Sequence, residues 1–352
     1  MKRILCLLII MMSVGCTATP STVPNVPGVN SQQPSALRPP LRVAVQAYFC
    51  SSMIGLIKQM EWDAQAGLPL ELVVYQDGVY LNEGLHNDEW DVAVTGGAFI
   101  HALANYDALL IGHQIDGTGC NSIYVRKGSS ILQDKGFNPT CPDVYGSARS
   151  VKGLNILHND GTTSSYLLAS WLESIGVARS SVNTLDSEFA DIFSRFYAGE
   201  GDGAAITTSA GVYSAQEYGW VEAASFETLG ISILESILCT KQAYDTRYDD
   251  ITLFMRLVYG ANDTLLADKQ LQYDVVEKWY ADTGNITSRN AVKYEVDNKS
   301  FIGTEQAKQL DMLDFAMNYA ESYVKMGVLL PEDLTEIREN IVVDMLQDVL
   351  GA

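Results

Sequence analysis

The chain alternates short apolar runs with amphipathic segments, and this pattern predicts its secondary structure. Apolar runs predict strands at 41–45, 70–75, 91–95 and 108–112. The segments between them have helical spacing and predict helices at about 52–66, 79–86 and 97–105. Strands that alternate with helices through short loops are typical of a parallel α/β sheet with helices on both faces.

The same pattern restarts after a loop at 128–150. The second series has predicted strands at 154–157, 182–185 and 203–207, and predicted helices at 162–175, 188–197 and 210–218. A long apolar stretch at 230–239 follows, and then a tail with predicted helices at 249–281, 304–326 and 332–349. Two similar α/β units and a helical tail indicate an α/β protein of two lobes.

We expect residues 41–120 together with 235–352 to form lobe 1, and residues 121–234 to form lobe 2. The hinge should lie at about 119–124 and 229–236, where the chain crosses between them. Ligands of open α/β sheets bind at the carboxyl ends of the strands. Two such sheets that face each other predict a cleft that can close around a ligand.

The N-terminus predicts export. Lys2 and Arg3 precede an apolar run at 4–12, which is too short to span a bilayer, since a spanning helix needs about 20 residues. Residues 1–15 therefore read as a secretory signal peptide. The small residues that lead to Cys16 resemble a bacterial lipobox, although Ser13 stands where such boxes usually carry Leu. This resemblance implies that Cys16 is lipidated and anchors the protein to the cell membrane, facing the periplasm or exterior. The alternative is an ordinary signal peptide with a coincidental cysteine.

A proline-rich tether follows at 16–40. Six of the ten prolines in the chain lie between residues 17 and 40, and Arg38 is the only charge there. Such a stretch favours extended geometry and acts as a semi-rigid spacer. The formal charge of the whole chain is −20. So acidic a protein is not expected to bind nucleic acid or anionic lipid headgroups, and we expect a monomer.

Four cysteines follow Cys16. The short spacing of Cys120 and Cys141, and the irregular loop at 138–143, predict a disulfide between these two. Cys50 and Cys239 could form a second bridge or remain buried thiols. The four histidines are scattered and no Cys/His cluster occurs, so neither a metal site nor a cofactor is expected.

Four stretches of the globular part carry a family resemblance: 41–47, 87–97, 151–165 and 196–206. In order and spacing they resemble the solute-binding proteins of ABC importers of the nitrate, sulfonate and taurine type. The resemblance covers about 41–350. It implies a two-lobed, type II periplasmic-binding fold with a C-terminal helical segment, and a binding protein rather than an enzyme. Such a protein captures a small solute and delivers it to a transporter permease.

Because of two departures from the family pattern, the resemblance does not determine which ligand this chain binds. Thr207-Thr-Ser-Ala210 stands where family members often carry Trp and Pro, and Gly161–Tyr166 lacks the frequent His. One alternative is a binder of a thiamine-precursor-like N-heterocycle. Another is a catalytic or sensing relative of the same fold.

The first candidate site is the start of the helix predicted at 162. Gly161, Thr162, Thr163 and Ser164 follow a strand there. Free N–H groups, partial positive charge and hydroxyls can together hold an anion. A plain helix cap is the alternative.

Other candidates follow strands in the same way: Gln46, Tyr48, Phe49, Thr95, Gly96, Gly97, Ser187, Glu188, Thr207 and Thr208. Phe49 is equally compatible with a core position. Because the 95–97 turn and the 162–164 helix start should lie on opposite lobes, we expect one anionic or zwitterionic solute, such as a sulfonate, to contact both. An acidic side chain facing the cleft would instead favour a ligand with an amine or N–H groups.

Overall fold

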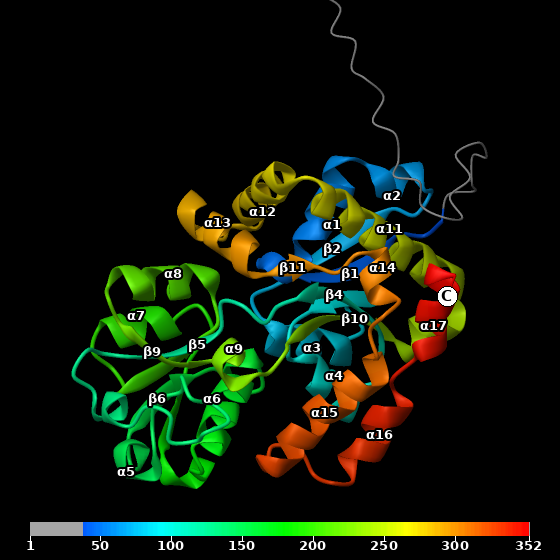
Figure 1. Cartoon of the computed structure of the whole chain (residues 1–352). Helices are drawn as coiled ribbons and strands as arrows, with labels where there is room; N and C mark the ends of the chain where they lie inside the picture. The colour runs from blue at the N-terminus through cyan, green and yellow to red at the C-terminus, as the bar shows by residue number, and fades with distance from the viewer. Residues whose placement is uncertain (1–37, 352) are drawn as a thin grey trace, which may run out of the picture.

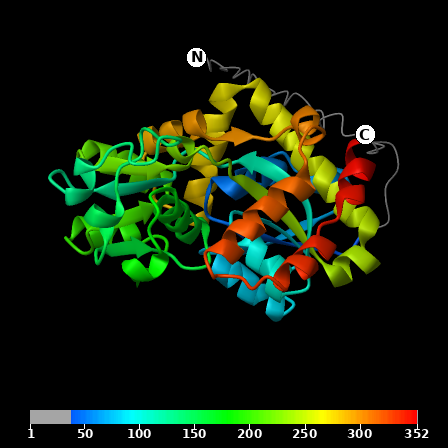
Figure 2. The same cartoon turned by 60° about the horizontal axis from the view of Figure 1, so that its bottom comes forward.

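A computed structural model describes residues 38–351, so Cys16 and nearly all of the tether lie outside the described residues. The described chain forms two α/β bodies, each built on its own sheet (Figures 1 and 2). The first sheet has the spatial order β11 (Ser300–Phe301), β4 (Ala108–Asp116), β10 (Leu234–Thr240), β3 (Val92–Thr95), β1 (Leu41–Gln46), β2 (Leu70–Tyr75). The second has the order β7 (Asn183–Asp186), β6 (Asn155–His158), β8 (Gly203–Ile206), β5 (Ser122–Val125), β9 (Val221–Ser225).

Both sheets are mixed, which corrects the expectation of parallel sheets. Strand β1 pairs in parallel with β2 and β3, but β10 runs antiparallel between β3 and β4. In the second sheet β5 runs antiparallel between β8 and β9. The reason is the crossing between bodies. The chain leaves the first sheet at the end of β4 and returns through β10, which therefore enters from the opposite direction.

The two crossing segments lie side by side. The Gly117 N–H donates to the Ile233 carbonyl at 2.9 Å, and the Ile233 N–H donates to the Thr118 hydroxyl at 2.9 Å. These hydrogen bonds join the two connecting segments to each other.

Helices cover both faces of the first sheet (Figure 1). Helices α1 (Ser52–Gln59), α11 (Tyr248–Ala267) and α12 (Lys269–Thr283) cover one face, where Met53, Leu257 and Trp279 share one buried cluster. Residues of α4 (Phe99–Asn105) and α15 (Met312–Lys325) belong to another cluster. The first body also contains α2 (Trp62–Gln65), α3 (Gly78–His86), α10 (Lys241–Thr246), α13 (Arg289–Asn298), α14 (Thr304–Ala307), α16 (Asp333–Glu339) and α17 (Val343–Leu350). The second body contains α5 (Ala148–Val151), α6 (Thr163–Ser174), α7 (Ile192–Tyr197), α8 (Ser209–Glu217) and α9 (Phe226–Leu229).

The second of these hydrophobic clusters continues from the first body into the second. Tyr319 on α15 lies with its ring centroid 4.2 Å from that of Tyr166 on α6, and Tyr323 lies 5.5 Å from the same ring. Both α15 tyrosines are buried. The tail helix α15 therefore packs against the second body.

The predicted Cys120–Cys141 disulfide is wrong for this structure, because all four described cysteines are free thiols. Cys141 packs into the cluster that contains Ile131 and Trp171, inside the second body. Cys120 instead lies at the crossing between the bodies, where charges of Lys299 and Glu295 act on it. The spacing in sequence therefore did not correspond to proximity in the fold.

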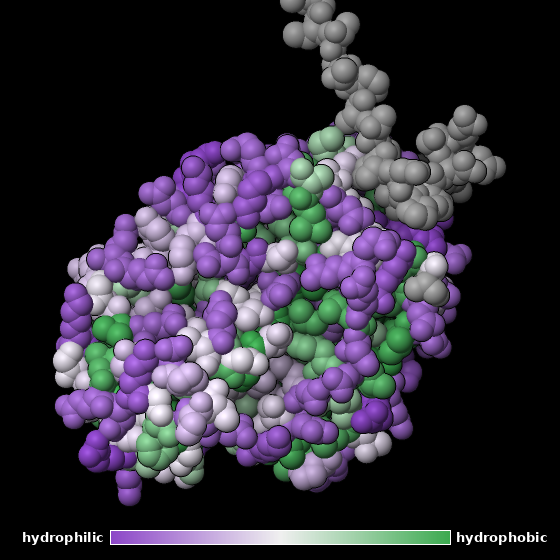
Figure 3. Space-filling model, in the orientation of Figure 1, coloured by the Kyte–Doolittle hydropathy of each residue, from purple (hydrophilic) through white to green (hydrophobic). Residues whose placement is uncertain are grey.

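The surface is mostly hydrophilic. Figure 3 shows charged and polar side chains over the viewed face, broken by smaller apolar patches. Within residues 38–351 no helix is long and apolar enough to cross a membrane. In the same residues no group of three or more His, Cys, Asp or Glu side chains is placed to hold a metal ion.

Candidate functional site

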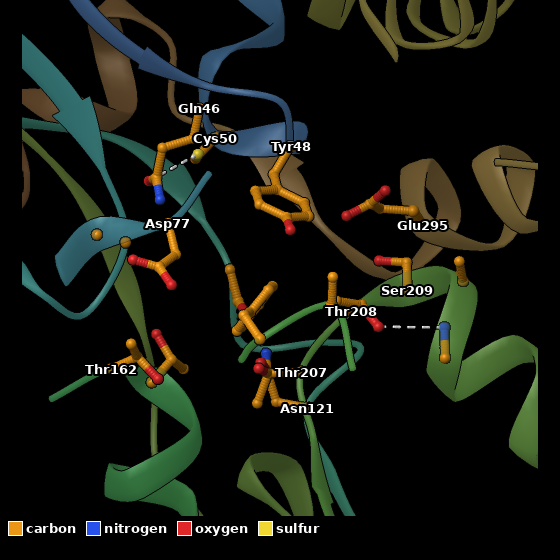
Figure 4. Close-up of a pocket in the computed structure, with 18 of the residues that line it drawn as sticks. Gln46, Tyr48, Cys50, Asp77, Asn121, Thr162, Thr207, Thr208, Ser209 and Glu295 are labelled. Carbon is orange, nitrogen blue, oxygen red and sulfur yellow. Dashed lines mark hydrogen bonds between the residues drawn. The ribbon is translucent and has the colours of Figure 1, made fainter. Parts of the chain in front are cut away.

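A cavity of about 340 Å³ lies between the two bodies. This is within the size range of small-molecule sites, which runs from about 300 to 1,000 Å³. Its walls come from segments that follow strands in both sheets, together with the α12–α13 connection and α13 (Figure 4). Nine of the residues predicted from the sequence line it: Gln46, Tyr48, Thr95, Gly96, Gly97, Thr162, Thr163, Thr207 and Thr208.

The two predicted turns meet across the cavity. The Gly97 N–H, in the first body, donates to the Thr163 hydroxyl, in the second, at 3.1 Å. A Cβ on Gly97 would lie 2.7 Å from that hydroxyl oxygen and 2.5 Å from the Tyr319 hydroxyl oxygen. A Cβ on Gly96 would meet nothing closer than 3.6 Å. Glycine at position 97 is thus required for this close approach of the bodies, and glycine at 96 is not.

The α6 start is stabilised as a helix cap. The Thr162 hydroxyl accepts from the Ser164 N–H at 3.2 Å and donates to the Asn159 carbonyl at 2.9 Å. The Ser164 hydroxyl donates to the Ala205 carbonyl at 2.8 Å and does not line the cavity. These two hydroxyls are therefore engaged within the protein, whereas the Thr163 hydroxyl reaches across to the other body.

Besides Ser164, four predicted candidates lie elsewhere than in the cavity. Phe49 is fully buried in the first body, with its ring centroid 4.8 Å from that of Phe301, so it is a core residue. Ser187 is buried and lines no cavity. Gly161 and Glu188 line a neighbouring groove of about 480 Å³, where the Tyr80 hydroxyl donates to the Glu188 carboxylate at 3.0 Å across the two bodies.

Four charged side chains in the cavity wall were not predicted: Asp77, Glu235, Glu295 and Lys299. Asp77 caps α3, with Oδ1 accepting from the Val79 and Tyr80 N–H groups at 2.8 and 3.2 Å. Its Oδ2 accepts no hydrogen bond from the described residues. Figure 4 shows the carboxylate directed into the space between Gln46 and Thr162.

The other three charges form a buried network. The Lys299 ammonium lies 3.1 Å from the Glu295 carboxylate and 3.8 Å from that of Glu235. The Tyr280 hydroxyl also donates to Glu295, at 2.5 Å. Lys299 is therefore paired with two acids, and the cavity as a whole carries more negative than positive side chains.

Burial shifts the ionisation of these groups. It raises the pKa of Glu235 to about 7, with the nearby Glu295 and Asp116 carboxylates acting in the same direction and Lys299 opposing them. Burial also raises the pKa of Asp77, and the carboxylates of Glu188 and Glu83 add to this. Burial disfavours the charge on Lys299, but Glu295 and Glu235 outweigh it and raise the Lys299 pKa.

Three polar atoms in the cavity wall have no hydrogen-bond partner among the described residues: Glu235 Oε2, Thr207 Oγ1 and Ser209 Oγ. Their residues are 8%, 6% and 4% exposed. A buried polar atom without a partner is costly, and native proteins seldom leave one unpaired without reason. These atoms are therefore candidates for bonds to a bound molecule.

Aromatic rings form another part of the wall. The Tyr48 and Phe189 ring centroids lie 5.1 Å apart in an edge-to-face arrangement, with Tyr48 from the first body and Phe189 from the second. Phe193 and Tyr280 also line the cavity. The site thus combines apolar rings with a few convergent polar groups, as small-molecule sites commonly do.

Comparison with known proteins agrees with this geometry. No known family model matches the chain. A Brachyspira hyodysenteriae protein, provisionally named as an ABC transporter periplasmic binding protein, is 28% identical over 311 residues, which cover 88% of this chain and 90% of that relative. Over most of its length the chain is therefore similar to a periplasmic binding protein of an ABC transporter.

Solved structures of periplasmic binding proteins share this fold. The alkanesulfonate-binding protein of Xanthomonas axonopodis pv. citri, bound to MOPS, superposes with a TM-score of 0.67 at 18% identity, over 88% of this chain and 100% of that one. The nitrate-binding protein of Synechocystis superposes with a TM-score of 0.67 at 8% identity, over 88% of each chain. At these identities the likeness concerns the fold.

Some residues that line the cavity could have been predicted from the sequence. Asp77 follows the predicted strand at 70–75 and precedes a predicted helix, which is the same rule that identified Thr95 and Thr162. Glu235 is a lone charge within the apolar stretch at 230–239. Lys299 lies four residues after Glu295 in the sequence. The helix α13 that carries Glu295 was not predicted, so the sequence did not indicate that these two residues lie in the cleft.

Proposed function

We propose that this chain captures a small solute between its two bodies and delivers it to the permease of an ABC importer outside the cytoplasm. The observation that carries the proposal is the cavity between the bodies, which is lined by strand ends of both sheets and bridged by the Gly97–Thr163 hydrogen bond. A solute that touches both bodies stabilises the closed arrangement by its differential affinity for closed over open. The relative's provisional name supports a transport role.

We further propose that the protein reaches this place as a lipoprotein, with Cys16 diacylated after removal of residues 1–15. Two acyl chains give stable anchoring, whereas one binds a membrane only marginally. The tether would then hold the bodies away from the bilayer. Mass spectrometry of the mature N-terminus tests this. A mature chain that begins at a residue other than Cys16 would contradict lipidation and leave solute capture untouched.

Among the ligands suggested by the family, a zwitterion agrees better with the site than a simple anion. The alkanesulfonate-binding neighbour was solved with MOPS, which carries both an amine and a sulfonate. Here the α6 start and the hydroxyls of Thr207 and Thr208 could receive an anionic group. Among residues 38–351, Lys299 is the one lysine in the cavity wall, and it is already paired with Glu295 and Glu235, so within this range a purely anionic ligand would find no unpaired lysine there.

The proposed role is binding of a solute without catalysis. Substitutions of two glycines test whether the solute binds in the cleft. Gly97→Ala would place a Cβ against Thr163 and Tyr319 and so obstruct closure, while Gly96→Ala is a matched control with ordinary contacts. The low-mass fraction of yeast extract serves as a mixed solute source. It should raise the melting temperature of the wild type and Gly96→Ala, and raise that of Gly97→Ala much less. An equal rise in all three would show that the solute binds outside the cleft.

A further inference from the structure

We infer that the captured solute is an organic cation with at least one N–H donor, a protonated amine or a cationic nitrogen heterocycle, whose positive group binds between Asp77 and Glu235. This rests on the proposed solute-capture function and names the chemical class that the site selects. It departs from the anions named for the sulfonate- and nitrate-binding neighbours.

The charge arrangement is the first support. Asp77, Glu235 and Glu295 oppose the single ammonium of Lys299 in the cavity wall. That ammonium lies closer to Glu295, at 3.1 Å, than to Glu235, at 3.8 Å. Asp77 forms no salt bridge among the described residues. A positive ligand group would therefore find two carboxylates that the protein itself leaves incompletely compensated.

The hydrogen-bonding capacity of the carboxylates is the second, independent support. Glu235 is 8% exposed, and its Oε2 has no partner among residues 38–351. Above its pKa of about 7, Glu235 is ionised and only accepts hydrogen bonds, so the atom that completes it there must be a donor. Asp77 likewise has one oxygen free, because its cap bonds use Oδ1 alone. N–H groups on the ligand can bond both carboxylates in their ionised form, whereas a sulfonate or nitrate oxygen could be bonded only by the protonated form of Glu235.

The rings of Tyr48 and Phe189 are the third support. They flank the cavity from opposite bodies, with centroids 5.1 Å apart. A cation over an aromatic face is attracted by the ring quadrupole, most strongly where water is excluded. Since no described acid cluster is placed to hold a metal ion, the cation that fits this wall is organic.

The experiment separates solutes by charge. Low-mass yeast extract is divided into cation-exchange-retained, anion-exchange-retained and unretained fractions, and each is added to the mature chain. The inference predicts that the cationic fraction raises the melting temperature, and that native mass spectrometry finds a bound nitrogen-containing cation. Asp77→Asn keeps a good helix cap, since Asn and Asp cap equally well. Asp77→Asn and Glu235→Gln should each lower the affinity for the cationic fraction by about tenfold to a hundredfold, as expected when a hydrogen bond to a charged group is lost.

Glu173→Gln is the matched control, because Glu173 is an exposed acid outside the cavity and its loss changes the net charge equally. It should respond as the wild type does. The inference is overturned if only the anionic or unretained fraction stabilises the wild type, or if both cavity variants respond unchanged to the cationic fraction. Those outcomes leave solute capture standing. If no fraction stabilises the wild type, the proposed function itself is overturned.

Discussion

The buried network at the edge of the cavity makes a specific prediction about stability. Lys299→Met removes the ammonium that pairs with Glu295 and Glu235 and replaces it with an apolar side chain of similar length. Glu295 is 3% exposed and Glu235 8%, so without the ammonium both carboxylates remain largely shielded from bulk water. Removing one partner of a buried ion pair costs about 3–5 kcal/mol of unfolding free energy, because an uncompensated charge remains.

The same reasoning predicts how this loss depends on pH. Burial already raises the folded-state pKa of Glu235 to about 7 against the opposing charge of Lys299, so without the ammonium this pKa rises further. A carboxyl group with a raised folded pKa stabilises the fold at low pH, where it is protonated, and this stabilisation is lost as pH rises through the folded pKa. The deficit of Lys299→Met relative to the wild type should therefore be largest at pH 8 and shrink toward pH 5.

Urea denaturation followed by tryptophan fluorescence at pH 5 and pH 8 measures both effects. The triple variant Lys299→Met, Glu295→Gln, Glu235→Gln is the control, because it removes the stranded charges together with the lysine. It should recover most of the loss at pH 8, since neutral replacements of a buried charge network are often tolerated. A Lys299→Met deficit below about 1 kcal/mol, or one that is equal at both pH values, would refute this account of the network.

Three further predictions follow from the same structure. Thr163→Ala removes the bond to the Gly97 N–H and should weaken the response to the low-mass extract by roughly two- to tenfold, whereas Thr162→Ala should mainly lower stability, by about 1 kcal/mol, as measured by calorimetry. Thiol titration of the denatured, unreduced mature chain should find Cys120 and Cys141 both alkylated, and a bridged peptide would contradict the free thiols. Burial raises the pKa of Glu235 to about 7, so this group should make the fold less stable as pH rises from about 4.5 to 7. In melting temperatures measured across this pH range, Glu235→Gln should remove the part of the decrease that this group causes.

Much of the fold could be predicted because its pattern is local. The strand predicted at 70–75 matches β2, and the helix predicted at 162–175 matches α6 closely. Long predicted helices were wrong where a local cap interrupts the apolar spacing. The helix expected at 249–281 is broken at Asp268, whose side chain accepts from the Gln270 and Leu271 N–H groups and starts α12.

The antiparallel strands were harder to predict, because their direction depends on how the chain crosses between the bodies. Strand β5 and strand β9 were not predicted, although both are paired within the second sheet. Strand direction is not encoded in apolar alternation, which is the same for either direction. The mixed sheets could therefore be established only from the three-dimensional arrangement.

The candidate site divides in the same way. Residues such as Thr95 and Thr207 were found because strand ends converge on one edge of a sheet, a rule that needs no tertiary information. Lys299 and Glu295 reach the cleft from the helical tail, whose path over the sheets has no simple sequence signature. Phe49 has the position of a ligand residue along the chain, but its ring turns into the core beside Phe301.

The central claim is that the two bodies close around a small solute. Small-angle X-ray scattering of the mature chain, with and without the low-mass extract, tests this most directly. The account predicts that the radius of gyration falls on addition of the extract for the wild type and Gly96→Ala, and stays at its open value for Gly97→Ala. A wild-type radius of gyration that does not change, in a sample whose melting temperature rises, would show that solute binds without closure and would contradict the account.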